Sequence, residues 1–201
     1  ARAGEIDAAR REVRELDMSA VDAMKSTYAD LIVVGQTDPD EGPLNAPPSF
    51  PELVALSVGR PVLFVPYFTA AYPTLGKKVL VAWNGSREAT RAVSDALPLL
   101  QRAERVTAMV VNAKRDHPDS VDIPAADISV FLARHGAKVE ATQSYTDELS
   151  VGDELLVRVA DREFDLLVMG AYGHSRLREI VLGGVTQTLL QHMTVPVLMS
   201  H

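Results

Sequence analysis

Apolar runs and helix-spaced apolar residues alternate along the last two-thirds of the chain. The run Lys78–Trp83 is followed by Asn84, Gly85 and Ser86, and an apolar run that ends in turn residues is typical of a strand buried on both faces. After it, apolar residues recur with helical spacing up to Leu100, with Ser86 as the expected N-cap and Pro98 weakening the last turns. The pattern predicts five strands and four helices in strict alternation. The other expected strands are Val106–Val111, Lys138–Thr146, Asp165–Gly170 and Val195–Ser200, and the other expected helices are Ala125–His135, Val151–Phe164 and Gly184–His192.

Strict alternation predicts an α/β fold, a parallel sheet with helices on both faces and right-handed crossovers. In such a sheet a ligand binds beyond the carboxyl ends of the strands, where the strand order reverses. We therefore look for binding residues in the turns at the ends of the strands.

The chain also contains an internal repeat. DLIVVGQ begins at Asp30 and DLLVMGA at Asp165, while PVLFVP begins at Pro61 and PVLMSH at Pro196. Both pairs are offset by 135 residues (165 − 30 and 196 − 61), so a strand, loop, helix and strand recur without a gap. We interpret residues 1–68 as the C-terminal part of a first domain and 77–201 as a complete second domain, joined by the link 67–76.

Composition excludes several classes of protein. The 201 residues include 27 acidic and 20 basic side chains, a net charge of −7, which argues against a nucleic-acid-binding protein. The absence of cysteine excludes a disulfide scaffold, a thiolate metal site and a thiol nucleophile. No uncharged apolar run approaches the roughly 20 residues of a membrane-spanning helix. We expect a cytoplasmic protein.

Glycine-rich turns occur at the ends of only two of the predicted strands of the second domain. One contains Gly85, and the other runs from Gly170 to the start of the last helix at Gly183 and Gly184. Glycines let the backbone approach a ligand closely, and a helix N-terminus presents free N–H groups and a partial positive charge. The two turns predict a cradle for a nucleotide phosphate, although neither GxxxxGKS, GxxxxGKT nor GxGxxG occurs in the sequence.

The segment GAYGHSRLREIVLGGVT, from Gly170 to Thr186, resembles the universal stress protein motif. In that motif a Gly, two residues, a Gly, nine residues, a Gly and a small hydroxyl residue bind the phosphates and ribose of ATP. KKVLVAWNGSREATRAV and TVPVLMSH resemble the first and last strands of the same family, and the likeness covers 77–201 and the end of the first copy. It implies a five-stranded parallel sheet in the order 3-2-1-4-5, of the adenine nucleotide alpha-hydrolase-like type, in tandem pairs or dimers joined through the last strand.

The resemblance also assigns the site. The end of the first strand would meet adenine and ribose, with Val111 and Met169 lining the adenine pocket and the glycine-rich segment holding phosphate and ribose. The predicted binding residues are Ala82, Trp83, Asn84, Val111, Met169, Gly170, Gly173, His174, Gly183, Gly184, Val185 and Thr186. The expected ligand is ATP or AMP, and whether Mg²⁺ accompanies it stays open.

Two residues depart from the family pattern. Asn84 replaces the usual Asp, and Gly184 replaces the small hydroxyl residue, for which Thr186 is a substitute. A lost neutral hydrogen bond costs about 0.5 to 1.5 kcal/mol, so the affinity would fall severalfold without abolishing the site.

Ordinary structural roles compete with each of these assignments. Gly183 and Gly184 also suit a helix start with tight packing, His174 a solvated loop, and Trp83 a core position. With the offset of 135 residues, Gly173 of the second copy corresponds to Asp38 of the first copy. The charge of Asp38 would repel phosphate, so we expect only the second domain to hold nucleotide. There too, Pro48 and Ser49 stand where the second copy has Gly183 and Gly184.

No catalytic base or nucleophile elbow accompanies the predicted phosphate site. We therefore expect a nucleotide-binding stress-response or regulatory protein that is not an enzyme. Two alternatives stay open, an interaction protein with a vestigial site and a slow ATPase. The expected partners are an adenine nucleotide and a second domain paired through the last strands, within the chain or in a homodimer.

The first copy is shorter than the second. The chain starts at Ala1 rather than Met, and the 76 residues before Lys77 hold counterparts of a helix (Ala1–Arg11), the third strand (Glu12–Leu16), the third helix and the fourth and fifth strands, but not of the first two strands. We expect these pieces to be unable to pair with one another, with backbone groups left unsatisfied, and the chain to be part of a longer tandem protein.

Overall fold

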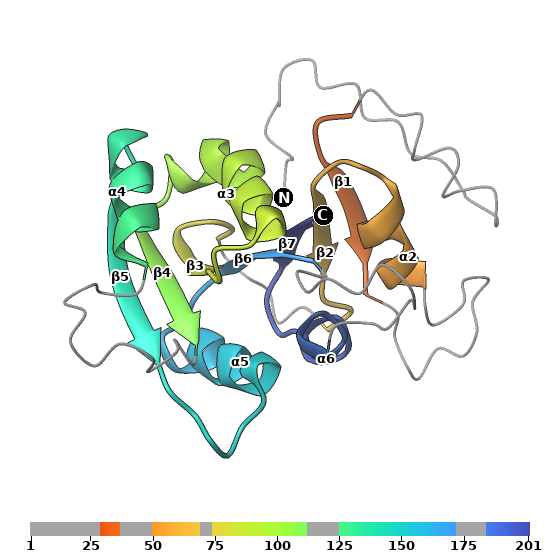
Figure 1. Cartoon of the computed structure of the whole chain (residues 1–201). Coiled ribbons are helices and arrows are strands. Elements are labelled where there is room, and N and C mark those ends of the chain that lie inside the picture. The colour runs from red at the N-terminus through yellow and green to blue at the C-terminus, as the bar shows by residue number, and fades with distance from the viewer. Residues whose placement is uncertain (1–28, 37–49, 69–73, 112–124, 172–183) are drawn as a thin grey trace.

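Seven strands form one mixed sheet in a computed structural model that describes residues 29–36, 50–68, 74–111, 125–171 and 184–201 (Figure 1). The strand order is β1-β2-β7-β6-β3-β4-β5. Neighbours are parallel except β2 and β7, which are antiparallel. The strands are β1 (Ile32–Gly35), β2 (Val62–Val65), β3 (Lys78–Ala82), β4 (Arg105–Val111), β5 (Val139–Ser144), β6 (Leu166–Gly170) and β7 (Val197–Ser200).

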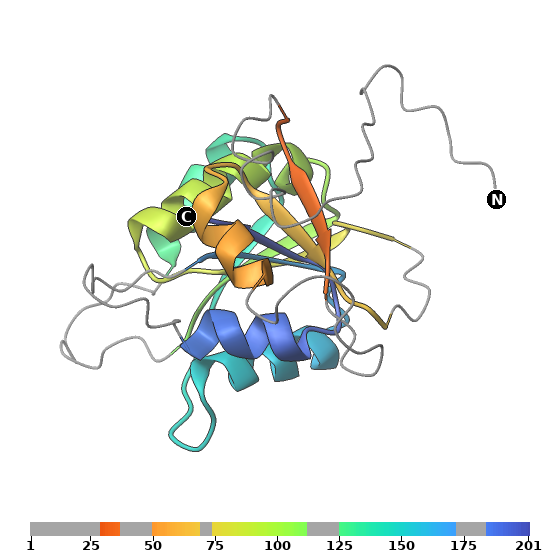
Figure 2. The same cartoon turned by 90° about the vertical axis from the view of Figure 1, so that its right-hand side faces the viewer.

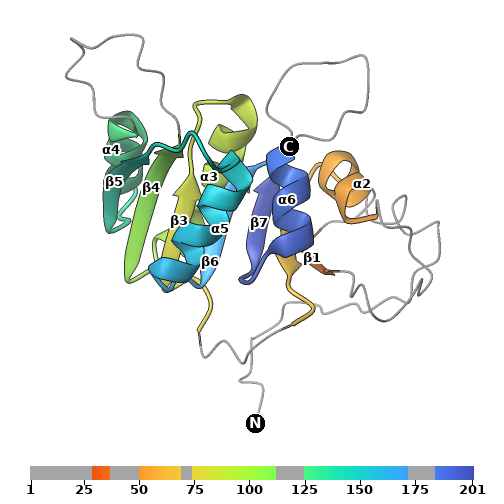
Figure 3. The same ribbon diagram turned by 90° about the horizontal axis from the view of Figure 1, so that it is seen from below.

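Helices cover both faces of the sheet. In Figure 3, α5 and α6 lie in front of the strands and α3 and α4 behind them, with α2 beside α6. The described helices are α2 (Phe50–Ser57), α3 (Arg87–Leu100), α4 (Ala126–Arg134), α5 (Val151–Asp161) and α6 (Gly184–His192). None of the helices in these described ranges is long and apolar enough to cross a membrane.

The local signals in the sequence act as expected in α3. Ser86 adopts extended backbone angles and its Oγ accepts the N–H of Ala89 at 3.1 Å, which is the N-cap geometry. Pro98 lies inside the helix, which nevertheless continues to Leu100.

The described sheet is mixed and has seven strands, two more than the five parallel strands expected for the second domain. The five strands from Lys78 to Ser200 are parallel and lie in the order β5-β4-β3-β6-β7. The two further strands join because β2 pairs antiparallel with β7, placing Val62 opposite Met199 and Phe64 opposite Val197.

The expectation that the first-copy strands could not pair was wrong for β1 and β2. They run parallel, and the N–H of Ile32 donates to the carbonyl of Pro61 at 3.0 Å. The N–H of Gln36 donates to the carbonyl of Val65 at 2.7 Å, so this pair satisfies backbone groups as any sheet does. The helix and strand expected at 1–11 and 12–16 lie outside the described residues.

Side-chain bonds tie the first-copy strands to the rest of the fold. The Gln36 amide nitrogen donates to the carbonyls of Leu190 and Gln191 at the end of α6, both at 2.9 Å, and its oxygen accepts the N–H of Tyr67 at 3.2 Å. Figure 2 shows α2 and α6 close together beside these strands. The carbonyls at the end of a helix lack intrahelical partners, so Gln36 caps α6 from another element.

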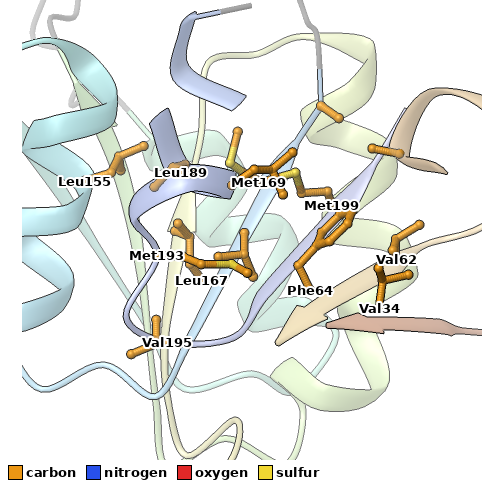
Figure 4. Packing of buried hydrophobic residues seen from close by; sticks show 14 of the residues in the cluster. Val34, Val62, Phe64, Leu155, Leu167, Met169, Leu189, Met193, Val195 and Met199 are labelled. Carbon is orange, nitrogen blue, oxygen red and sulfur yellow. The ribbon is translucent and has the colours of Figure 1, made fainter. Parts of the chain in front are cut away.

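Two apolar clusters hold the layers together, one on each face of the sheet. The cluster under α5, α6 and α2 contains Phe64, Leu167, Met169, Leu189 and Met199 (Figure 4). The cluster under α3 and α4 contains Val79, Val81, Val93, Leu100 and Val168. Neighbouring residues of a strand therefore belong to opposite clusters, as strand alternation requires.

Candidate functional site

A row of apolar side chains lies near the carboxyl edge of the sheet. Ala82 of β3 lies opposite Met109 of β4 on one side and Met169 of β6 on the other. Met169 in turn lies opposite Met199 of β7, and Figure 4 shows these two methionines together beneath α6. We call Ala82, Met109 and Met169 the apolar floor. Met109 and Met169 are almost fully buried and Ala82 is half-buried, and flexible methionine side chains can adapt to a neighbouring ligand.

Four of the predicted binding residues lie on this face of the sheet. Met169 belongs to the buried cluster under α5 and α6, and Ala82, Val111 and Val185 are half-buried against the same cluster. Trp83 is half-buried too, but it packs against the cluster on the opposite face. The structure therefore separates Trp83 from the other four, and its packing is that of a core residue.

The turn after β3 is held by its own side chains. Gly85 has a φ of 71°, in the left-handed region that favours glycine. The Oδ1 atom of the exposed Asn84 accepts the N–H of Ser86 at 3.0 Å. An aspartate could make the same bond, so the replacement of the usual Asp by Asn84 keeps the shape of the turn and changes only its charge.

Gly170 is required by packing. A Cβ on this residue would lie 2.4 Å from the nitrogen of Ala89 and 2.5 Å from the carbonyl carbon of Glu88, both backbone atoms of the first turn of α3. The φ of Gly170 lies outside the left-handed region, so closeness rather than backbone conformation demands glycine. The first glycine of the motif thus lets α3 begin directly over the end of β6.

Glu88 places a carboxylate beside this contact, and sequence reasoning missed it. The residue is 8% exposed and its Oε1 accepts from Arg87 Nε at 3.2 Å. Burial alone would raise the pKa of the Glu88 carboxyl, but bonds from its own backbone N–H, Arg87 and Ser86, with the charge of Arg87, hold the pKa below its usual value. In the sequence, Glu88 is an acidic residue in the first turn of a predicted helix. Such a residue usually does no more than interact favourably with the helix dipole.

The helix α6 begins at an exposed residue, Gly184. A Cβ on Gly184 would meet no atom of the described part of the chain within 4 Å. Thr186, the predicted substitute hydroxyl, is 2% exposed, so its side chain lies inside the fold. Gly173, His174 and Gly183 lie outside the described residues, as do the first-copy positions Asp38, Pro48 and Ser49.

A small pocket lies between β3, β4, β5 and α5 and shares Met109 with the apolar floor. Its volume is about 40 Å³, and Thr107, Met109, Arg158 and Phe164 are among its lining residues. Ligand sites for drug-sized molecules measure roughly 300 to 1,000 Å³, so this one suits a water molecule rather than a nucleotide. Among the residues the structure describes, no three acidic, His or Cys side chains gather as a metal site.

The family model for the universal stress protein family matches residues 76–201. The chain belongs to this family. Universal stress protein Slr1230 from Synechocystis sp. (strain ATCC 27184 / PCC 6803 / Kazusa) is 30% identical over 150 residues, or 73% of this chain and 49% of that protein. The chain thus spans about half the length of this curated relative.

Solved structures show the same fold. A universal stress protein from Archaeoglobus fulgidus DSM 4304 matches with a TM-score of 0.67 and 18% identity, over 90% of this chain and 63% of that one. Universal stress protein UspA from Lactobacillus plantarum matches with a TM-score of 0.51 and 20% identity, over 64% of this chain and 99% of that one.

Proposed function

We propose that residues 77–201 bind one adenine nucleotide, ATP or AMP, and that the chain is a cytoplasmic regulatory protein rather than an enzyme. The observation that carries the proposal is the apolar floor of Ala82, Met109 and Met169 in register across three strands, with the exposed first residue of α6, Gly184, at the same edge. An adenine ring needs such a floor, and a phosphate needs free N–H groups.

The charges at this edge favour one orientation of the nucleotide. Glu88 and Arg87 form an ion pair at the start of α3, with Arg87 Nη2 3.1 Å from Glu88 Oε1, so the two charges offset each other there. The start of α6 has Gly184 and no acidic residue in its first turn. We infer that the phosphates lie toward α6, with any Mg²⁺ held through them, and that the base lies over Ala82 and Met169.

The last strands support a tandem arrangement of the two copies. Because β2 and β7 are antiparallel neighbours and β6 occupies the other side of β7, both edges of β7 are taken within the chain. The pairing of β2 with β7 therefore favours an intramolecular pair of copies over a homodimer, since a homodimer through β7 would have to displace β2.

A gain-of-binding variant tests the site. Gly184→Ser restores the hydroxyl of the family motif at an exposed position, and one added hydrogen bond of about 0.5 to 1.5 kcal/mol should tighten ATP binding about 2- to 13-fold. The matched control is Gln191→Ser at the other, exposed end of α6, which should leave the affinity unchanged. Equal affinities for all three proteins would mean that the start of α6 does not contact the nucleotide.

Two rival functions make opposite predictions. The interaction protein with a vestigial site is favoured by the buried hydroxyl residue Thr186, and it predicts no binding of ATP at millimolar concentration. A slow ATPase predicts release of phosphate, and turnover above about 1 per second would contradict the non-enzymatic proposal.

A further inference from the structure

Gln36 joins the first copy to the helix α6 of the second domain. Its backbone N–H donates to the carbonyl of Val65 at 2.7 Å, and its Oε1 accepts the N–H of Tyr67 at 3.2 Å. Its Nε2 donates to the carbonyls of Leu190 and Gln191, both at 2.9 Å. Both N–H groups of the side-chain amide are thus used, and Gln36 is held between the first copy and the end of α6.

The internal repeat shows that only the first copy has this side chain. Gln36 corresponds to Ala171 of the second copy (171 − 36 = 135), and Val65 corresponds to Ser200 (200 − 65 = 135). The backbone bond is the same in both copies, since the N–H of Ala171 donates to the carbonyl of Ser200 at 2.8 Å. The methyl group of Ala171 has nothing to donate. The bonds to α6 are therefore an addition of the first copy to a shared backbone pattern.

The helix α6 is short and poor in helix-forming residues. It has nine residues, and isolated helices shorter than about 12 to 15 residues are marginal in water. Four of the nine are glycine or β-branched residues, which disfavour a helix: Gly184, Val185, Thr186 and Thr188. The carbonyl of Leu189 accepts the N–H of Met193 at 2.8 Å, and the next two carbonyls accept from Gln36. Gln36 thus satisfies groups that a helix end otherwise leaves to water.

The beginning of α6 belongs to the predicted nucleotide site. Gly184 and Val185 are its first residues, and Val185 packs against the buried cluster that contains Met169 of the apolar floor. Leu189, further along the helix, belongs to the same cluster (Figure 4). Because helix formation is cooperative, a bond that stabilises the last turn also raises the fraction of molecules in which the first turn is formed. A nucleotide that binds only the formed helix then binds more tightly by the same factor.

We propose that Gln36 is a positioning residue through which the first copy controls the affinity of the second domain for nucleotide. The inference rests on the nucleotide binding proposed for residues 77–201. Gln36 lies at the far end of α6 and acts through the helix, which it holds so that Gly184 and Val185 meet the ligand. Linkage requires the reverse effect as well, so bound nucleotide strengthens the attachment of Gln36 to α6 and stabilises the end of β1.

Calorimetric titration of ATP into the full chain compares Gln36→Met with the original sequence. Methionine keeps the length of the side chain, removes both donors and adds no charge. ATP should bind about 3- to 10-fold more weakly to Gln36→Met, the change that the net loss of about one hydrogen bond produces. Gln36→Glu keeps the acceptor for Tyr67 but turns a carboxylate toward the two carbonyls of α6, so it should weaken binding at least as much.

The matched control is Gln101→Met. The Gln101 amide donates to the carbonyl of His135 at 2.9 Å, at the end of α4, so it makes the same kind of bond to a helix that contains none of the predicted binding residues. Urea unfolding should show that both variants are destabilised, whereas only Gln36→Met should also lose affinity for ATP. A merely structural role of Gln36 predicts the loss of stability alone.

Hydrogen exchange gives a second readout, in the first copy itself. Saturating ATP should slow exchange of the Tyr67 amide in the original chain by about the same 3- to 10-fold, because this amide donates to Gln36. ATP should have no such effect in Gln36→Met. The amide of His135, at the end of α4, should exchange equally fast with and without ATP.

Equal affinity of ATP for Gln36→Met and the original chain would overturn the inference while leaving the nucleotide site in place. An equal loss of affinity in Gln101→Met would also overturn it, because the effect would then be one of general stability. If the original chain binds no ATP at millimolar concentration, the proposed function itself fails, and this inference fails with it.

Discussion

Replacing Gly170 by alanine should destabilise the fold without any nucleotide present. The added Cβ would lie 2.4 Å from the Ala89 nitrogen and 2.5 Å from the Glu88 carbonyl carbon, far inside van der Waals contact. Both are backbone atoms of a helix turn that Ser86 caps, so no side chain can rotate away to make room. The end of β6 and the start of α3 would have to move apart.

Overpacking typically lowers the free energy of unfolding by about 1 to 3 kcal/mol. Gly170→Ala should lie near the upper end of this range, about 3 kcal/mol, because the new Cβ meets backbone atoms. The lower entropy of the unfolded chain with alanine offsets about 0.4 to 1 kcal/mol of this. The net loss of about 2 kcal/mol corresponds to a fall in Tm of about 4 to 8 °C for a chain of this size.

The assay is urea and thermal unfolding followed by circular dichroism, with Gly184→Ala as the matched control. A Cβ on the exposed Gly184 meets no atom within 4 Å among the residues that the structure describes, and alanine favours a helix over glycine by up to about 1 kcal/mol. The control should therefore be at least as stable as the original chain. If Gly170→Ala unfolds at the same urea concentration as the original chain, the close approach of α3 to β6 is wrong.

Two further variants test the packing and electrostatics of α5. Gly152→Ala would bring a Cβ within 2.8 Å of Thr188 Cβ on α6, so unfolding should show a loss of about 1 to 3 kcal/mol, and an unchanged midpoint would argue against this helix contact. Burial alone would raise the pKa of Glu154, but hydrogen bonds from Ser144 and Arg158 and the charge of Arg158 hold its pKa below the usual value. Because the folded-state pKa is the lower one, this stabilisation is present above the unfolded-state pKa of about 4.3 and is lost as the pH falls through the folded pKa. Glu154→Gln should therefore lower the free energy of unfolding at about pH 7 and make it fall less steeply as the pH drops below about 5. If the variant loses stability in acid as steeply as the original chain, Glu154 does not contribute to that loss.

The elements of the fold follow from local sequence, whereas their assembly follows from contacts between distant residues. Ser86 caps α3 as predicted because capping depends on neighbouring residues alone. The antiparallel pairing of β2 with β7 had no local signal, since both are short apolar runs and such runs do not specify a neighbour.

Some features of the candidate site could be predicted from the sequence, and others could not. Strand alternation alone places Ala82 and Trp83 on opposite faces, so the separation of Trp83 from the adenine floor could have been read from the sequence. The closeness of Gly170 to the first turn of α3 could not, because it depends on how β3 and β6 lie side by side. The same holds for Glu88, which reads as a surface charge and becomes buried through this contact.

Calorimetric titration of ATP and AMP into the full chain tests the central claim most directly. We expect saturable binding of one nucleotide per chain, and loss of that binding in Gly173→Asp, which imports the first-copy residue Asp38. Circular dichroism should show that the variant remains folded. No heat of binding at millimolar ATP and AMP, or an unaltered affinity in Gly173→Asp, would contradict a nucleotide site built on this edge of the sheet.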